Sequence, residues 1–181
     1  NPDRLVVCLD GDWRPSWRVD IFPDYKANRA KTPDEFRSQM SYLHELVESF
    51  GITQFEREGF EADDIIATIA KQAEADGFEV AICTGDRDSF QLVNDKTTVL
   101  YPKRGVSEMA RMTPAAVEEK YMLTPTQYPD FAALRGDPSD NLPSVPGVGE
   151  KTAAKWIIEY GSLKELLNKA DPVPGKAGES L

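Results

Sequence analysis

GFEADD, residues 59–64, places three carboxylates at the point where a short strand pattern gives way to a helical one. A second acidic stretch, TGDRD at 84–88, follows the strand-like run VAIC at 80–83. Carboxylates at the C-terminal end of a buried strand and in the first turn of the next helix can point into one crevice. Such carboxylates repel one another without counter-ions, so the group is typical of a metal site or of shared protons.

Strand and helix patterns alternate around these two stretches. A buried strand is expected at 5–9, and further strands are expected at 52–55, 79–83 and 97–101. Between the first two, apolar residues recur at helical spacing from Phe36 to Phe50, with Thr32 as the expected cap, Pro33 at the first position and Glu35 completing a capping box. Residues 11–18 are polar and broken by proline, so they are expected to be irregular. The pattern predicts an α/β domain whose mainly parallel sheet is covered on both faces by helices.

From residue 113 onward the pattern is helical, with helices expected at 115–120, at 125–135 and up to Tyr160. We therefore predict two domains, an α/β core at 1–112 and a helical subdomain at 113–181. The end of the chain, 171–181, holds two Pro and two Gly and is expected to fray.

Composition sets broad limits on the class of protein. The 181 residues are 40% hydrophobic and 29% charged, which is ordinary for a globular protein. No apolar run approaches ~18 residues, so no membrane-spanning helix is expected. Cys8 and Cys83 lie in strand patterns and are expected to be buried free thiols in a reducing cytosol. His44, the only histidine, lies off the apolar stripe of its helix and is expected at the surface.

The net charge of −10 argues at first against a nucleic-acid partner. Much of this charge, however, lies in the acids of a few motifs. They are Asp10, Glu61, Asp63, Asp64, Asp86, Asp88, Asp137 and Asp140. Acids and bases nearly balance elsewhere, so a cation-filled acidic site would leave a near-neutral surface that can carry local basic patches.

The acidic stretches indicate which metal they would bind. Oxygen ligands without histidine or cysteine select Mg²⁺ or Mn²⁺ over zinc. Acids from several regions of the chain indicate two ions, which suits in-line attack on a phosphodiester. The alternative is that GFEADD supplies favourable charge to a helix N-terminus and that TGDRD forms a solvated turn.

Two further motifs carry basic residues. PGVG at 146–149 opens a helix with Lys151 and Lys155 in its first turns, where backbone amides and lysines can contact phosphate. YKANR at 25–29 sets an aromatic residue beside two bases, as in proteins that bind single strands. Taken alone, the first motif also fits a tight turn and the second a solvated loop.

These motifs, in this order, resemble the 5′-nuclease domain of bacterial DNA polymerase I and its stand-alone relatives in the flap endonuclease family. The residues that carry the match are 25–29, 59–64, 84–88, 136–141 and 146–155. The block FAALRGDPSDN at 131–141 agrees throughout. The resemblance implies a PIN-like or resolvase-like α/β core followed by a helix-two-turns-helix element.

The resemblance also implies roles for individual residues. The first metal site would be formed by Asp10, Glu61, Asp63 and Asp64, and the second by Asp86, Asp88, Asp137 and Asp140. Lys26 and Arg29 would be catalytic residues of a mobile arch that meets the 5′ strand, with Tyr25 also binding DNA. The helix-two-turns-helix element at 145–156 would grip duplex DNA and hold K⁺. Its DNA-binding residues would be Gly147, Gly149, Lys151, Thr152 and Lys155.

The implied activity is a 5′-3′ exonuclease or flap endonuclease that needs Mg²⁺ or Mn²⁺ and hydrolyses DNA at flaps, nicks or single-stranded 5′ ends. Its implied roles are replication and repair, including removal of RNA primers from hybrids. The implied setting is a monomer in the bacterial cytoplasm, associated with the nucleoid and with no membrane partner.

The chain departs from the family pattern at both ends. The family's first strand, which ends in Asp-Gly, and the gate helices after it have no counterpart before Leu5. The family's last helices have no counterpart after the duplex-binding element. We therefore expect a fragment, and two alternative functions stay open: a catalytically impaired, structure-specific DNA-binding fragment and a PIN-type ribonuclease.

Overall fold

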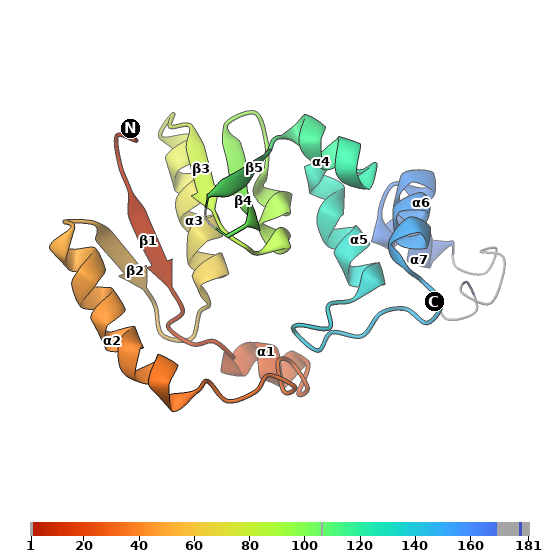
Figure 1. Cartoon of the computed structure of the whole chain (residues 1–181). Helices are drawn as coiled ribbons and strands as arrows, with labels where there is room; N and C mark the ends of the chain where they lie inside the picture. Colours follow the sequence, from red (N-terminus) through yellow and green to blue (C-terminus); the bar gives the residue numbers. More distant parts are fainter. Residues whose placement is uncertain (1, 106, 170–177, 179–181) are drawn as a thin grey trace. The chain divides into compact units, whose positions relative to one another are not determined.

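The computed structural model describes residues 2–105, 107–169 and 178 (Figure 1). The chain forms two compact units, Asn1–Ile69 (unit 1) and Ala70–Leu181 (unit 2). Helix α3 (Ala62–Ala75) runs through the boundary between them.

Unit 1 is built on two parallel strands. β1 (Val6–Leu9) pairs with β2 (Thr53–Glu56), and the two run side by side in Figure 1. Between them in sequence lie α1 (Ser16–Ile21) and α2 (Asp34–Ser49), and α2 packs against β2. The backbone amides of Gly11 and Asp12 both donate to the Phe60 carbonyl, at 3.1 and 3.0 Å. A Cβ at Gly11 would lie 2.0 Å from the Arg57 carbonyl oxygen, so only glycine allows the loop after β1 to approach GFEADD this closely.

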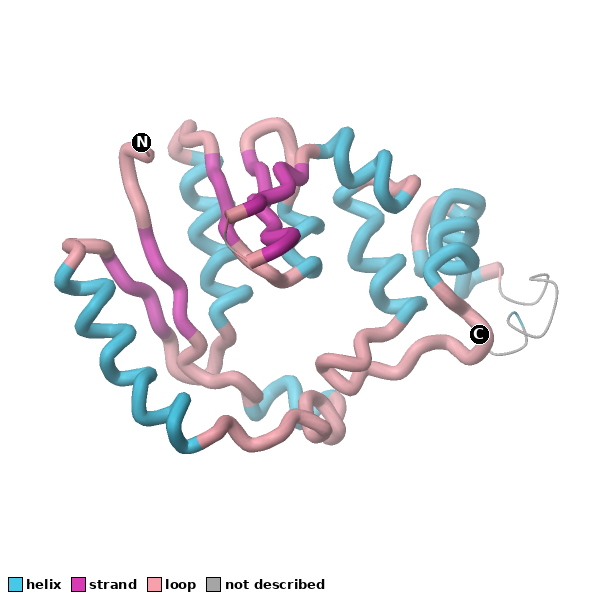
Figure 2. Tube along the Cα trace, in the orientation of Figure 1, coloured by secondary structure: helices cyan, strands magenta, loops and turns pink. Residues whose placement is uncertain are grey.

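Unit 2 combines a three-stranded sheet with helices (Figure 2). The strands are β3 (Val80–Cys83), β4 (Thr97–Arg104) and β5 (Glu108–Met112), with the 3₁₀ helix η1 (Arg87–Leu92) after β3. β3 pairs with β4 in parallel, and β4 pairs with β5 antiparallel. The helices that follow are α4 (Pro114–Tyr121), η2 (Pro125–Gln127), α5 (Tyr128–Arg135), α6 (Glu150–Tyr160) and α7 (Leu163–Asn168).

An aromatic cluster fixes η1 in unit 2. Phe90 of η1 is fully buried and lies against Tyr101, Tyr121 and Tyr128, with ring centroids 5.5 to 6.0 Å apart. Tyr128 contacts Phe131 at 5.6 Å. Edge-on aromatic contacts of this kind stabilise beyond the burial of their area. The cluster therefore anchors the short helix that follows TGDRD.

Several local predictions need correction. Residues 16–21 form α1, because Pro15 suits the residue before a helix although it breaks a strand. The next helix, α2, begins one residue later than predicted, with Pro33 rather than Thr32 at its N-cap and no side-chain capping bond there. The extended backbone of Pro33 (φ −54°, ψ 142°) places it outside the helix.

Burial in unit 1 is lower than predicted. Leu5 and Val6 of the first strand pattern are 56% and 36% exposed. Among the described side chains of α2, Val47 alone is buried, while Phe36 and Leu46 are largely exposed. The strand is half-exposed because β1 pairs with β2 in a sheet of only two strands.

Cys8 and Cys83 are free thiols as predicted, but neither is buried: Cys8 is half-buried and Cys83 exposed. His44 is exposed, as predicted. Within the described part of the chain, no helix is long and apolar enough to span a membrane. The predicted fraying at 171–181 lies outside the described residues, apart from residue 178. The predicted domain boundary at 112/113 stays a prediction.

Glu74, near the end of α3, offers a test of the packing in unit 2. Its carboxylate accepts hydrogen bonds from Thr97 Oγ1 and from Asn94 Nδ2 (2.7 Å), and it pairs with Lys71 Nζ at 3.0 Å. These bonds, that from Thr97 foremost, lower the pKa of Glu74 to about 2. Since the pKa of Glu74 is lower in the folded than in the unfolded chain, its ionised carboxylate stabilises the fold fully above pH 4.5. This stabilisation is lost as the pH falls toward 2.

We predict that Glu74→Gln lowers the free energy of unfolding at pH 7 by about 1 kcal/mol, after allowance for solvent screening. The variant should also lose less stability than the parent between pH 4.5 and pH 2. Urea unfolding across this pH range measures both effects, with the exposed Glu79→Gln as the control. Equal pH dependence in both variants would contradict the assigned role of Glu74.

Candidate functional site

The acids of unit 1 gather at the N-terminus of α3. The Asp10 Oδ1 atom accepts a hydrogen bond from the Ala62 amide at 2.7 Å, and Asp64 Oδ2 accepts one from the Glu61 amide at 3.0 Å. These amides are among the donors that a helix leaves unsatisfied at its start. Asp64 therefore has the alternative role considered for GFEADD, favourable charge at a helix N-terminus, and Asp10, from outside the motif, has the same role.

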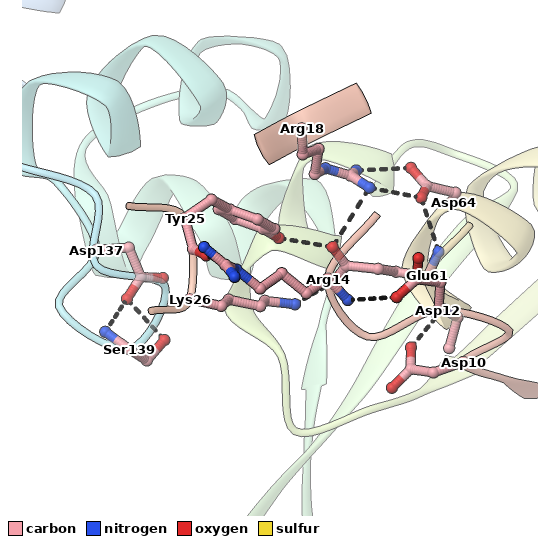
Figure 3. Close-up of polar contacts among 11 residues, drawn as sticks. Asp10, Asp12, Arg14, Arg18, Tyr25, Lys26, Glu61, Asp64, Asp137 and Ser139 are labelled. Carbon is pink, nitrogen blue, oxygen red and sulfur yellow. Dashed lines mark hydrogen bonds and ion pairs between the residues drawn. The ribbon is translucent and has the colours of Figure 1, made fainter. Parts of the chain in front are cut away.

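Cations neutralise two of these acids (Figure 3). Arg18 donates two hydrogen bonds to Asp64, Nη1 to Oδ2 at 2.9 Å and Nη2 to Oδ1 at 2.8 Å, and its Nη1 lies 3.3 Å from Glu61 Oε1. Lys26 Nζ donates to Glu61 Oε2, and the Tyr25 hydroxyl donates to Glu61 Oε1 at 2.7 Å. The hydrogen bond from Arg18 is the main cause that lowers the pKa of Asp64, and it raises that of Arg18. The counter-ions of Glu61 and Asp64 are thus basic side chains of the same unit.

The first half of YKANR is not a solvated loop. Tyr25 and Lys26 are 7% and 5% exposed, and Lys26 adopts a left-handed backbone (φ 53°). Arg14 holds the turn through hydrogen bonds from Nε to the Tyr25 carbonyl and from Nη2 to the Pro23 carbonyl, both at 2.6 Å. The solvated-loop alternative is therefore wrong for Tyr25 and Lys26, whereas Arg29 at the end of the motif is exposed.

Asp63 lies close enough to Cys8 of β1 for their charges to interact. Its charge contributes, after burial, to raising the pKa of the Cys8 thiol. Asp10, Glu61, Asp63 and Asp64 therefore all lie around the junction of β1 and α3, and Asp64 and Glu61 share the guanidinium of Arg18.

In unit 2, local hydrogen bonds orient the acids. Asp86 caps η1, its Oδ1 accepting from the Asp88 amide at 2.8 Å. The Asp137 Oδ1 atom accepts from the Ser139 amide (2.8 Å) and hydroxyl (2.7 Å). Gly136 just before it has φ 72°, and a Cβ there would lie 2.5 Å from the Ser144 amide nitrogen. Glycine is therefore needed for the turn that presents Asp137.

These acids line a pocket of about 580 Å³. Asp86 and Asp88 from η1 and Asp137 from the loop after α5 lie on its wall, together with Arg135 and Gly149. Burial, and then the charges of Asp86, Asp137 and Asp140, raise the pKa of Asp88 to about 6. A carboxylate held among like charges favours a proton or a cation, so this is the part of unit 2 best suited to a metal ion.

The residues in and just after PGVG lie on two surfaces of unit 2. Gly149, the N-cap of α6, and Glu150 line the acidic pocket, and Gly147 has a left-handed backbone (φ 78°). Lys151 and Lys155 line a second groove of about 610 Å³, whose lining is largely apolar and also includes Glu150. Thr152 lies between them on α6 and is half-buried.

Sequence reasoning missed Arg18 and Arg135. Arg18 lies in the stretch that was predicted to be irregular. The side chain of Arg135 is 18% exposed, its guanidinium lies 5.4 Å from the centroid of the Phe131 ring, and its charge partly opposes the rise in the pKa of Asp88. Among the residues that the structure describes, no three His, Cys, Asp or Glu side chains are grouped so that they could hold a metal ion.

Comparison with protein families assigns both parts of the chain. Residues 1–122 match the model of the 5′-3′ exonuclease N-terminal resolvase-like domain, and residues 123–181 match that of the 5′-3′ exonuclease C-terminal SAM fold. The predicted fold class, an α/β resolvase-like core followed by a helical DNA-binding element, is confirmed by these matches.

Curated relatives agree with this assignment. The chain is 61% identical over 180 residues to DNA polymerase I of Mycobacterium tuberculosis and 46% identical over 175 residues to that of Bacillus subtilis. These alignments cover 99% and 97% of this chain and 20% of each relative. The chain thus spans about a fifth of the length of these proteins.

Two solved structures share the fold. The T5 D15 protein co-crystallized with metal ions has a TM-score of 0.80 at 24% identity, with 98% of this chain and 68% of that one covered. The catalytic core of Rad2 in complex with DNA substrate has a TM-score of 0.58 at 18% identity, with 98% and 54% covered. At these identities the likeness is one of fold.

The raised pKa of Asp88 predicts that this acid destabilises the metal-free fold at neutral pH. Because its pKa is higher in the folded than in the unfolded chain, its stabilising effect is present below about pH 4 and is lost as the pH rises through about 6. Asp88→Asn should therefore raise the free energy of unfolding at pH 7.5, in EDTA, by about 1 kcal/mol after solvent screening. Urea unfolding measures this, and the exposed Asp95→Asn serves as the control. Equal stability of Asp88→Asn and the parent at pH 7.5 would refute the proposed repulsion.

Proposed function

The chain belongs to the 5′-3′ exonuclease family, and on this basis we propose that it hydrolyses phosphodiesters at 5′ ends, flaps and nicks of DNA with divalent metal ions. The observation that carries this proposal is the acidic pocket of unit 2, where burial, and then the charges of neighbouring carboxylates, raise the pKa of Asp88 to about 6. Carboxylates that are held together in spite of their repulsion are typical of the metal sites of enzymes that cleave phosphodiesters.

The carboxylates of the two units would form two metal sites, each belonging to one unit. The site of unit 2 would be formed by Asp86, Asp88, Asp137 and Asp140. Because these carboxylates repel one another, a divalent cation bound among them would stabilise the group. Asp10, Glu61, Asp63 and Asp64 would form the site of unit 1. Oxygen ligands favour Mg²⁺ or Mn²⁺, and the fold relative T5 D15 was crystallised with metal ions. When bound, such ions lower the pKa of water and stabilise the leaving oxygen of a phosphodiester.

The chain's own residues would bind and orient the substrate. Lys26 and Arg29 would act as the cations of the catalytic site, with Tyr25 beside them. The free amides at the start of α6 would contact a duplex phosphate after Gly147 and Gly149. Lys151, Thr152 and Lys155 would add further phosphate contacts, and K⁺ would bind at this turn.

The substrate would be DNA with a 5′ flap, a nick or a single-stranded 5′ end, including hybrids that carry an RNA primer. Two fold relatives support a DNA partner, a T5 D15 flap endonuclease complex with DNA and metal ions and the Rad2 core with DNA substrate. The two domains would be a nuclease core at 1–112 and a duplex-binding subdomain at 113–181. We place the protein in the bacterial cytoplasm with the nucleoid, as a monomer that acts in replication and repair.

One observation favours a second candidate function. Glu61 and Asp64 are already neutralised by Arg18 and Lys26, as expected of a structure-specific DNA-binding fragment whose cleavage is impaired. Binding of branched DNA without turnover would distinguish this function from a nuclease. A preference for single-stranded RNA over flap DNA would instead indicate a PIN-type ribonuclease.

Cleavage of an end-labelled 5′-flap duplex by the 181-residue chain tests the proposal. We predict cleavage near the junction with Mg²⁺ or Mn²⁺, none with EDTA, and a rate lower by roughly 100-fold or more in Asp86→Asn/Asp88→Asn, which lacks two ligands. Flap binding by this variant should be retained or tighter, because negative charge facing the phosphates is removed. The matched control is Glu79→Gln/Asp95→Asn, which makes the same change in charge at exposed sites. Metal-dependent cleavage at the parental rate in Asp86→Asn/Asp88→Asn would contradict the proposal.

Lys151 and Lys155 test the duplex contact separately from the chemistry. Lys151→Ala/Lys155→Ala should weaken flap binding about tenfold and reduce the slope of log affinity against log salt by about one to two. Fluorescence anisotropy in Ca²⁺ measures binding, with Lys71→Ala/Lys103→Ala as the control for lost charge. An unchanged salt slope would mean that these lysines do not contact phosphate.

A further inference from the structure

All four carboxylate oxygens of Glu61 and Asp64 accept hydrogen bonds or ion pairs from unit 1 (Figure 3). The two oxygens of Asp64 receive the guanidinium fork of Arg18 and the Glu61 amide. Glu61 Oε1 receives Tyr25 and Arg18, and Oε2 receives Lys26. A divalent cation would need lone pairs of the same oxygens at about 2.0 to 2.2 Å, so these donors compete with a metal ion at both acids.

The basic side chains are held in place by contacts of their own. The Arg18 guanidinium lies 4.3 Å from the centroid of the Trp17 ring. Trp17 Nε1 donates to the Gly59 carbonyl at 3.1 Å, which ties α1 to the turn before Glu61. The side chains of Lys26 and Glu61 are only 6% and 7% exposed, and a buried charge of either sign requires a partner. The ion pairs are therefore held in place by the surrounding contacts of unit 1.

We propose that Arg18, together with Lys26, is the counter-ion of Glu61 and Asp64 in the metal-free protein. These ion pairs must break before a divalent cation can bind to the two carboxylates. Arg18 is a positioning residue in this scheme, since it acts through the carboxylates. It keeps like-charged acids together and ordered in the absence of metal, and it lowers their affinity for metal. This inference rests on the proposed metal dependence of the site.

The test is the affinity of metal-free, DNA-free protein for Mn²⁺, measured by titration calorimetry. Arg18→Gln should bind Mn²⁺ about tenfold tighter or more, because a competing positive charge is removed from the carboxylates. The same gain should appear in an Asp86→Asn/Asp88→Asn background, which assigns it to unit 1. Arg18→Lys, which keeps the charge, should stay nearer the parent. In EDTA, Arg18→Gln should melt at a lower temperature, since two partly buried acids lose their partner.

Arg57→Gln is the matched control. It removes the same charge from the same unit, and the Arg57 guanidinium likewise lies near an aromatic ring, 5.7 Å from that of Phe60. Its Mn²⁺ affinity should stay within about threefold of the parent, because Arg57 is exposed and an exposed charge is largely screened by solvent and salt. Unchanged or weaker Mn²⁺ binding by Arg18→Gln, or an equal gain in Arg57→Gln, overturns the inference.

A measurement on the parent protein covers the case in which Arg18→Gln does not fold. Phenylglyoxal should modify Arg18 faster with Mn²⁺ than with EDTA, while Arg57 reacts equally in both, as mass mapping of peptides would show. Equal rates at Arg18 overturn the inference. Flap cleavage by the parent separates the two proposals. If the parent cleaves but Arg18→Gln binds Mn²⁺ no more tightly, only the counter-ion role of Arg18 is refuted. If Arg18→Gln binds Mn²⁺ more tightly but the parent does not cleave, only the nuclease function is refuted.

Discussion

The carboxylates of this chain must each be paired, protonated or hydrated, and this constraint shapes both units. A buried charge without a partner costs several kcal/mol, and neighbouring like charges add to that cost. Unit 1 meets the constraint with cations: Arg18 and Lys26 neutralise Asp64 and Glu61. Unit 2 meets it with a pocket, in which Asp88 has its pKa raised to about 6. The same type of motif therefore has two different electrostatic states within one chain.

The acids also contribute to the local fold. Asp10 and Asp64 accept from the first amides of α3, and Asp86 accepts from the Asp88 amide at the start of η1. A helix N-terminus offers unsatisfied donors and a favourable field, so a carboxylate there stabilises the helix whether or not a metal is bound. Because Phe90 anchors η1 in the aromatic cluster, the acids at its start have a rigid support. Folding and the proposed chemistry thus use the same residues.

Much of the architecture could be predicted from sequence. Apolar periodicity located α2, and the helical pattern that follows GFEADD located α3. The strands predicted at 79–83 and 97–101 were predictable for the same reason, since periodicity reports a local property of the chain. The errors concern burial, one short helix and the first residue of α2. The exposed face of α2 and the exposed Cys83 could not be predicted, because an apolar residue becomes buried only if another element covers it.

The sequence by itself determined the acidic motifs, their positions at strand ends and helix starts, and the family to which the chain belongs. Only the tertiary structure decided what each acid faces. Arg18 and Asp64 are 46 residues apart, and Lys26 and Glu61 are 35 apart, so no local pattern indicates that they pair. The structure likewise buries Tyr25 and directs Lys151 and Lys155 to a groove apart from the acidic pocket. The physical reason is that periodicity and capping act over a few residues, whereas ion pairing and burial depend on which distant segments pack together.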